Sequence, residues 1–306
     1  MSGYHNPVLL AEVLVWLNPQ PGQCYIDGTA GGGGHSHALA ERVGPEGRIL
    51  AIDQDSDALE ECAKALKGLP VTLWRGNFAQ LVQAQSETQT GPVNGILLDL
   101  GVSSHQLDTA ERGFALRYAG PLDMRMDTDS DGETAAELLN RLPEVEIARI
   151  LFEYGEETRS RRIAAEIVKA RPLQTTEDLV DCLRRAMPFR TRPGEIHPAT
   201  KTFQAVRIAV NAELEVLEQG LRAAVEVLTP GGRLAILSYH SLEDRIVKTR
   251  FNALAGKREG SDLPSLEPDP PLLIDILTRK PISPSETEVR VNPRARSAKL
   301  RVAQKK

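Results

Sequence analysis

The feature that most constrains the fold is a series of short aliphatic runs that alternate with helical stretches between residues 24 and 100. The runs cover residues 24–27, 48–53, 71–74 and 95–100, with helical spacing at 36–42 and 57–66. Because each run is almost continuously apolar, we expect strands that are buried on both faces of a parallel sheet. Right-handed crossovers then place the carboxyl ends of these strands at one edge, where open α/β sheets bind ligands.

After residue 107 the pattern becomes helical. Helices are expected at 134–142, 144–154, 159–169 and 176–186, and a long amphipathic helix at 206–228. Strands are expected again at 233–239, 273–278 and 298–303, and the Gly- and Pro-rich stretch 256–271 reads as a mobile loop. These patterns predict an α/β domain formed by residues 1–107 and 206–306, with an all-helical domain, 108–205, inserted after its fourth strand.

Composition excludes several classes of protein. The chain has 306 residues, of which 41% are hydrophobic and 26% charged, which is typical of a globular protein rather than a disordered one. No stretch reaches the roughly 20 apolar residues of a membrane span, and the N-terminal residues do not resemble a signal peptide. The scattered Cys24, Cys62 and Cys182 have neither disulfide-framework nor zinc-ligand spacing. We therefore expect a cytoplasmic location and no membrane association.

The charge is unevenly distributed. The formal net charge is −5, which argues against a protein that binds nucleic acid over its entire surface. However, nine basic and only two acidic residues lie between residue 279 and the end. The segment 292–306 is therefore a candidate for phosphate contacts, with a solvated tail as the alternative. Other candidates near the end of the insert, for which a solvated helix face is the alternative, are Arg184, Arg185, Arg190, Arg192 and Lys201.

A glycine-rich turn follows the first strand. The stretch DGTAGGGGHSHALA, residues 27–40, combines close backbone approach with the free N–H groups of a helix start. No register of it gives the G-x-G-x-x-G pattern of dinucleotide-binding folds; the spacing is Asp27-x-Thr29-x-Gly31-x-Gly33. An acid before the turn would repel a pyrophosphate and suits a cationic ligand, such as the amino group or sulfonium of S-adenosylmethionine.

Two further positions point to an adenosine ligand. Asp53 lies 22 positions after Gly31, at the end of the second strand, where an acid accepts hydrogen bonds from ribose hydroxyls. NAD enzymes and methyltransferases share this feature, and a helix N-cap is the alternative role. Phe78 follows the third strand, where it could stack on adenine or fill the core.

The fourth strand ends at Asp99, beside the expected position of the methyl donor. Many amino-methyltransferases have an Asp or Asn here, followed by two prolines and an aromatic residue, which this chain lacks. The histidines form no H-E-x-x-H motif, so no metal site is expected. Neither a G-x-S-x-G motif nor a Cys–His pair is present, so we expect the chemistry to belong to cofactor and substrate.

Longer strings give the chain a specific resemblance. They are HNPVLLAEVL at 5–14, YIDGTAGGGGHS at 25–36, GILLDLGVSSHQLDTAERGF at 95–114, GPLDMRMD at 120–127, YGEE at 154–157, HPATKTFQAVRIAVNAEL at 197–214, GGRLAILSYHSLEDRIVK at 231–248 and NPRARSAKLR at 292–301. In these blocks the chain closely resembles the MraW/RsmH family, the 16S ribosomal RNA cytosine-N4 methyltransferases. Two departures are Lys201, where the family commonly has Arg, and Tyr239, where it commonly has Phe.

The resemblance implies a Rossmann-like class I S-adenosylmethionine-dependent methyltransferase sheet with the inserted helical domain as its RNA-recognition part. It implies methylation of one cytosine in the decoding region of 16S ribosomal RNA. The residues that it assigns to the S-adenosylmethionine site are Gly33, Gly34, His35, Asp53, Phe78, Asp99 and Gln106. Asp99, carbonyl groups of residues 100–104 and side chains of residues 240–245 are candidates to accept a hydrogen of the target amine.

Two other functions remain as alternatives at this point. An NAD-dependent oxidoreductase would share the acid at Asp53, although the missing third glycine and Asp27 argue against it. A non-catalytic RNA-binding or ribosome-assembly factor would keep the fold without methyl transfer. The sequence also leaves open whether the substrate is free RNA or the small ribosomal subunit, and whether the chain forms a homo-oligomer.

Overall fold

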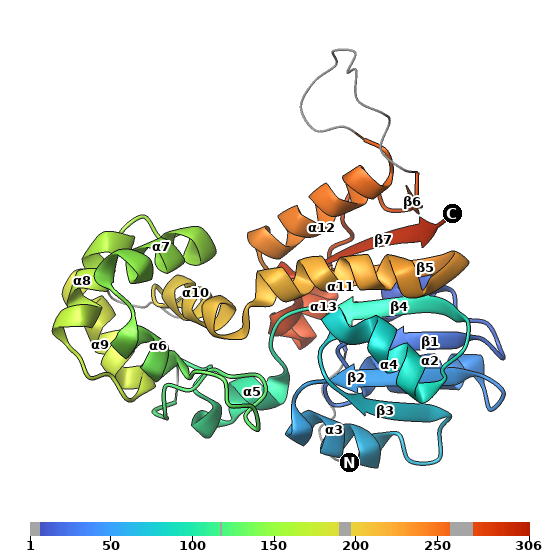
Figure 1. Ribbon diagram of the computed structural model, residues 1–306, viewed down its shortest axis with the longest axis horizontal. Coiled ribbons are helices and arrows are strands. Elements are labelled where there is room, and N and C mark those ends of the chain that lie inside the picture. The colour runs from blue at the N-terminus through green and yellow to red at the C-terminus, as the bar shows by residue number, and fades with distance from the viewer. Residues whose placement is uncertain (1–6, 117, 190–196, 258–271) are drawn as a thin grey trace. The chain divides into compact units, whose positions relative to one another are not determined.

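The computed structural model describes residues 7–116, 118–189, 197–257 and 272–306 (Figure 1). The chain divides into two compact units, the first formed by residues 1–101 and 214–306 and the second by residues 102–213. The expected insert, 108–205, lies within the second unit. Residues 258–271 of the expected loop, and the candidates Arg190 and Arg192, lie outside the described residues. No helix in the described parts is long and apolar enough to cross a membrane.

The first unit is built on a sheet of seven strands within the described residues (Figure 1). They are β1 (Cys24–Asp27), β2 (Arg48–Asp53), β3 (Val71–Arg75), β4 (Val93–Asp99), β5 (Leu228–Ser238), β6 (Ile274–Ile276) and β7 (Lys299–Lys305). The spatial order is β3-β2-β1-β4-β5-β7-β6. Strands β1 to β5 pair in parallel, whereas β7 runs antiparallel to β5 and to β6. The parallel sheet expected from the aliphatic runs is therefore confirmed.

Successive residues of the central strands bury their side chains in two different apolar clusters. Ile26, Leu50 and Ile96 belong to one cluster, together with residues of α4, α11 and α12. Tyr25, Ile49 and Leu97 belong to the other, together with residues of α1 and α2. Because successive side chains of a strand point to opposite faces, helices cover both faces of this sheet.

The first unit has seven helices in its described residues, of which the two expected at 36–42 and 57–66 are confirmed. They are α1 (Leu10–Leu17), α2 (Gly34–Val43), α3 (Ser56–Ala65), α4 (Leu81–Thr88), α11 (Glu213–Val227, whose first residue belongs to the second unit), α12 (Ser241–Leu254) and α13 (Glu286–Val291). Short 3₁₀ turns lie at Phe78–Gln80 and Pro293–Ser297. Asp55 caps α3 by accepting a hydrogen bond from the Asp57 backbone N–H, which leaves Asp53 free of the capping role.

The basic C-terminal segment is not a tail. Residues 299–305 form β7, between β5 and β6, and Arg301 is only 8% exposed. Arg301 Nε lies 2.7 Å from Asp244 Oδ1, and Lys299 Nζ lies 3.1 Å from Asp244 Oδ2. Lys305 Nζ donates to the carbonyl groups of Glu226 and Leu228. The solvated-tail alternative is therefore wrong for residues 299–305, because Lys299 and Arg301 pair with Asp244 of α12 and Lys305 binds carbonyl groups. Phosphate contact by the rest of the segment stays a prediction.

The second unit is helical in its described residues. Its helices are α5 (Ser104–Asp108), α6 (Ala135–Arg141), α7 (Glu144–Gly155), α8 (Ser160–Lys169), α9 (Thr176–Ala186) and α10 (Thr200–Asn211), with a 3₁₀ turn at Ala110–Arg112. One apolar cluster joins them, and it includes Leu139, Leu151, Ile163 and Leu183. Each such side chain, when fully buried, contributes about 1.5–3 kcal/mol to stability.

The single helix expected at 206–228 is wrong. The chain forms α10 and α11, which are separated at Ala212, a residue with the left-handed φ of 47°. The cause is a set of tertiary hydrogen bonds from the side chain of Asn211. Its Oδ1 accepts from Met126 N at 2.7 Å, and its Nδ2 donates to the carbonyl of Met124 at 2.8 Å. The helix therefore ends where it is fastened to the 124–126 loop.

Candidate active site

Three acids end neighbouring parallel strands at the carboxyl edge of the sheet. Asp27 ends β1, Asp53 ends β2 and Asp99 ends β4, and both β2 and β4 pair with β1. The Asp99 backbone N–H also donates to Thr29 Oγ1 at 2.6 Å, which ties β4 to the glycine turn after β1. The fold thus brings together the acids that the sequence placed at separate strand ends, as expected for a ligand-binding edge.

Asp27 holds the glycine turn in place. Its side chain is fully buried; Oδ1 accepts from Thr29 N at 3.2 Å, and Oδ2 accepts from Ser36 Oγ at 2.7 Å. Desolvation by burial raises the pKa of this carboxyl above its ordinary value. Asp27 therefore fastens the turn to the first residues of α2, and direct contact between this acid and a cationic ligand, as the sequence suggested, is not supported.

The glycine turn is crowded on one side and open on the other. A Cβ at Gly33, which has a φ of 82°, would lie 3.2 Å from Cys62 Sγ, and a Cβ at Gly34 would lie 2.7 Å from Pro7 Cγ. In contrast, a Cβ at Gly31 or at Gly32 would meet nothing within 4 Å. The turn therefore leaves unfilled space beside Gly31 and Gly32, while Gly33 and Gly34 pack against the protein.

Asp53 is bound to the same turn. Its Oδ2 accepts from Gly31 N at 2.7 Å, and its Oδ1 accepts from Asp55 N at 3.0 Å. Desolvation raises the pKa of the Asp53 carboxyl to about 6, although both backbone hydrogen bonds lower it. Each oxygen has a second lone pair, so this carboxylate can accept further hydrogen bonds from hydroxyl groups.

Asp99 is the centre of a three-residue cluster with His35 and Tyr239. Tyr239 Oη donates to Asp99 Oδ1 at 2.7 Å, and His35 Nε2 lies 3.5 Å from Asp99 Oδ2. The His35 side chain is only 7% exposed, and neither ring nitrogen has a hydrogen-bond partner in the described residues. The Asp99 side chain keeps 22% of its surface exposed, so an incoming group can reach it.

Tyr239 is a site residue that sequence reasoning missed. It directly follows β5, whose Leu237 is the register partner of Asp99, and this position was the available signal. Burial and the charge of Asp99 both raise the pKa of the Tyr239 hydroxyl. The hydroxyl is therefore a stable donor to Asp99 rather than a proton-transfer group.

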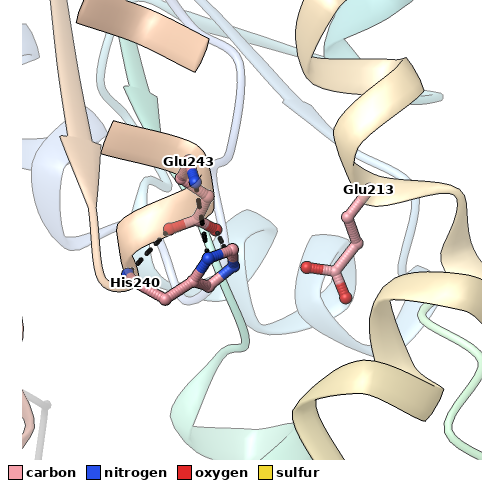
Figure 2. Close-up of side chains that lie close together, drawn as sticks. All are labelled: Glu213, His240 and Glu243. Carbon is pink, nitrogen blue, oxygen red and sulfur yellow. Dashed lines mark hydrogen bonds and ion pairs between the residues drawn. The ribbon is translucent and has the colours of Figure 1, made fainter. Parts of the chain in front are cut away.

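His240 and Glu243 form a helix cap next to this cluster (Figure 2). Glu243 Oε2 accepts from Tyr239 N at 2.7 Å, and Glu243 Oε1 lies 3.1 Å from His240 Nε2. Glu243 is only 3% exposed, and the cap fixes the start of α12. These contacts favour the structural interpretation of this segment, and they position Tyr239 through its backbone.

Phe78 and Gln106, both expected in the cofactor site, also make contacts within the protein. The Phe78 ring packs against α11, because a Cβ at Gly220 would lie 2.3 Å from Phe78 Cδ2. One part of this half-buried ring therefore fills the core, as one alternative stated. Gln106 belongs to the second unit, is 5% exposed, and its Oε1 accepts from Ser103 N at 3.0 Å.

The basic residues expected to contact phosphate also have partners. Arg184 pairs with Asp181 at 2.9 Å, and Arg185 pairs with Glu166 at 3.3 Å. Lys201 Nζ donates to the carbonyl of Glu156 at 3.3 Å. These three side chains therefore already bind acidic or carbonyl groups of the same unit, which leaves less of their charge available to a phosphate.

Comparison with known proteins identifies the family. The model of the MraW methylase family matches residues 2–306. The chain belongs to the MraW methylase family. It is 52% identical to the protein named ribosomal RNA small subunit methyltransferase H of Heliobacterium mobile, with 100% of both chains aligned. It is 50% identical to the protein of the same name from Geobacter sulfurreducens, again over 100% of both.

Membership agrees with the topology described above: the sheet is the Rossmann-like sheet of class I methyltransferases, and S-adenosylmethionine is the cofactor. The residues at the edge fit this cationic nucleoside. Space is open beside Gly31 and Gly32, and the Asp53 carboxylate can accept further hydrogen bonds. Both ring nitrogens of buried His35 lack a hydrogen-bond partner in the described residues. A buried polar side chain without a partner is costly, which is why such groups commonly mark ligand sites.

Proposed function

We propose that this methyltransferase methylates N4 of a specific cytosine in the decoding region of 16S ribosomal RNA. The observation that carries the proposal is the carboxylate of Asp99, which is fixed by Tyr239 yet partly exposed at the sheet edge. A carboxylate is an acceptor for the N–H groups of an exocyclic amine. The printed names of the relatives, which specify small-subunit ribosomal RNA, support the substrate class.

For S-adenosylmethionine, we propose that the ribose hydroxyls donate to Asp53. The backbone of Gly33 and Gly34 would lie along the methionine part of the cofactor. His35 would supply a hydrogen bond from its unpartnered ring nitrogens. Phe78 would border the adenine with the part of its ring that does not contact α11. We keep Gln106 as a cofactor contact on the resemblance alone. Hydrogen bonds to a charged acceptor such as Asp53 contribute about 1.5–3 kcal/mol each.

When bound, S-adenosylmethionine would supply a sulfonium methyl group to the cytosine N4, which would lose one proton in exchange, and S-adenosylhomocysteine would be the other product. The lone pair of N4 is delocalised into the ring, so the amine is a weak nucleophile. Asp99 would accept a hydrogen bond from N4 and localise this lone pair toward the methyl group. Tyr239 and Thr29 hold Asp99 by its side chain and its backbone, and such orientation can contribute several kcal/mol to the lower barrier.

The second unit would recognise the RNA, because a target base must leave its stack to enter a methyltransferase pocket and the surrounding strand must be held. We also propose a cytoplasmic location, with 16S ribosomal RNA or the small ribosomal subunit as the partner, which the printed names of the relatives support.

The test is transfer of a labelled methyl group from S-adenosylmethionine to 16S ribosomal RNA by the purified chain, followed by mass spectrometry of the nucleosides. We expect one N4-methylcytidine in the decoding region. Binding of the RNA without methyl transfer would instead support the assembly-factor alternative. A methyl group on another atom or another base would contradict the assignment of Asp99.

A further inference from the structure

Three arginines at the start of α8 differ from the other exposed arginines of the second unit. Arg159, Arg161 and Arg162 are exposed, and among the described residues none has a carboxylate within ion-pair distance. Arg159 makes one side-chain contact, from Nη1 to the sulfur of Met187 at 3.5 Å. Three guanidinium groups that have no carboxylate partner among the described residues therefore lie within four consecutive residues.

Every other exposed arginine that the structure describes in this unit is neutralised by an acid. The shortest ion-pair distances are 2.6 Å for Arg141 to Glu133, 2.7 Å for Arg149 to Glu146, 2.9 Å for Arg184 to Asp181 and 3.3 Å for Arg185 to Glu166. The unit therefore does not leave its arginines unpaired at random. Among the described residues of this unit, exposed arginines without an acidic partner are confined to one helix start.

The start of α8 is also electrostatically unusual. Helices α6 and α9 begin with capping boxes formed by Thr134 with Glu137 and by Thr175 with Asp178. Helix α8 has Arg159 as its N-cap residue, without a side-chain cap and without an acid in the first turn. Cations at the positive end of a helix oppose its dipole and cost stability. An anion bound there would remove this cost.

Two acids precede this start, at residues 156 and 157, and neither carboxylate lies within ion-pair distance of the three arginines. Glu157 is 7% exposed, and its Oε1 accepts from the backbone N–H of Arg159 at 2.9 Å. The opposite face of α8 is anchored in the core by Ile163, Ala164 and Ile167, which are all fully buried. The arginines therefore stand on a rigid support, which lowers the entropy lost when they bind a ligand.

We propose that Arg159, Arg161 and Arg162, the α8 arginine surface, bind the phosphodiester backbone of the RNA substrate. Guanidinium groups match phosphate geometry with two parallel hydrogen bonds, and free arginines at a helix start add to the affinity of that end for anions. This inference rests on the proposed function and makes it more specific. It moves the RNA contact from Arg184 and Arg185, which are paired with acids, to residues that are not.

The test is a triple substitution, R159Q/R161Q/R162Q, in the full chain. Binding of a fluorescent decoding-region RNA is measured by anisotropy over a series of salt concentrations. Each lost phosphate contact reduces the slope of log K against log salt by about 0.7 for single-stranded RNA. We therefore expect a slope smaller by about 2 and an affinity at least tenfold lower. S-adenosylmethionine binding should stay unchanged, because Asp53 and the glycine turn belong to the first unit.

The matched control is R141Q/R149Q/R184Q, which removes the same charge from exposed arginines that have acidic partners. We expect its affinity for the RNA to change less than threefold. A second variant, R159K/R161K/R162K, keeps the charge and should recover most of the slope but not all of the affinity. Thermal unfolding of the glutamine variant, compared with that of the wild type, shows whether its loss of binding comes from misfolding.

Equal losses in the glutamine variant and in the control, or unchanged binding in the glutamine variant, would overturn the α8 arginine surface. Either result would leave the proposed function intact if the wild-type chain methylates the RNA. A wild-type chain that binds RNA through this surface but transfers no methyl group would contradict the proposed function alone.

Discussion

The sheet edge of the first unit and the start of α8 in the second use charge in opposite ways. At the edge, Asp27 and Asp53 end strands β1 and β2, which fixes where they lie. Both accept hydrogen bonds from backbone N–H groups of the glycine turn. At α8 the charges are exposed, and Arg161 lacks an acidic partner among the described residues, whereas Arg184 pairs with Asp181. Charge at the edge is thus positioned by the fold, and charge at α8 is defined by what the fold leaves unpaired.

The largest effect is expected at a buried ion pair of the first unit. Asp244→Ala leaves Arg301 buried without its partner, which should cost about 3 kcal/mol of unfolding free energy. Urea unfolding measures this loss, and Asp181→Ala, which breaks the exposed pair with Arg184, should cost less than about 1 kcal/mol. Equal losses of unfolding free energy in the two variants would show that the buried pair of the first unit contributes no more stability than the exposed pair of the second.

The Asp244 pair also gives a pH dependence with a definite sign. Burial alone would raise the pKa of Asp244, but the hydrogen bonds from Arg301 and Lys299 outweigh it, and the net pKa is lowered. The stabilisation is therefore present above the ordinary carboxyl pKa and is lost as the pH falls below it. Asp244→Ala should lack this part of the acid-induced loss of stability.

Asp99→Ala should reduce methyl transfer at least about 100-fold, the scale of losing one group that stabilises a transition state. Single-turnover kinetics with labelled donor measure the step directly. An Asp99→Ala enzyme with near wild-type turnover would show that the edge only binds cofactor and that another group accepts the amine.

Two glycines of the same turn should respond in opposite ways. A Cβ at Gly28 would lie 2.5 Å from Leu98 Cδ2, so Gly28→Ala should cost about 1–3 kcal/mol of stability by overpacking. A Cβ at Gly32 meets nothing, so Gly32→Ala should unfold like the wild type and instead weaken S-adenosylmethionine binding. Calorimetric titration and thermal unfolding of both variants separate the effects. Reversed results would mean that the open side of the turn is not where the cofactor lies.

Cofactor affinity should rise with pH through the pKa of Asp53, about 6. Because the proposed ribose contact uses the ionised carboxylate as acceptor, the affinity at pH 5 should be about tenfold below its plateau above pH 7. Asp53→Asn should bind weakly at every pH, with a flat profile between these values. A wild-type profile that is equally flat would dissociate Asp53 from cofactor binding.

The smallest effect is expected for Tyr239→Phe. The variant removes the 2.7 Å donor to Asp99 but keeps the ring, and the resemblance indicates that Phe is common here. We expect about a threefold to tenfold lower kcat, from a loss of about 1 kcal/mol, with little change in the KM for RNA. A change in KM alone would assign Tyr239 to RNA binding rather than to the orientation of Asp99.

The sequence predicted the sheet edge of the first unit better than it predicted the charge pairing elsewhere in the chain. Aliphatic runs and the acids that end them predicted the parallel strands and brought Asp53 and Asp99 to one edge, because strand direction determines where a strand end lies. The break at Ala212 was not predictable, because it depends on hydrogen bonds between Asn211 and a loop about 85 residues away. Pairing of Lys299 and Arg301 with Asp244, and of Arg184 with Asp181, likewise becomes visible only when the fold is known.

The most direct test of the central claim is a calorimetric titration of S-adenosylmethionine into the wild-type chain and into Asp53→Ala at pH 7.5. The claim is that the carboxyl edge of the sheet binds this cofactor through Asp53, the last residue of β2. We predict one site in the wild type and at least about tenfold weaker binding in the variant, from the loss of one or more charged hydrogen bonds. Equal affinities in the two proteins, or no binding by the wild type, would contradict it.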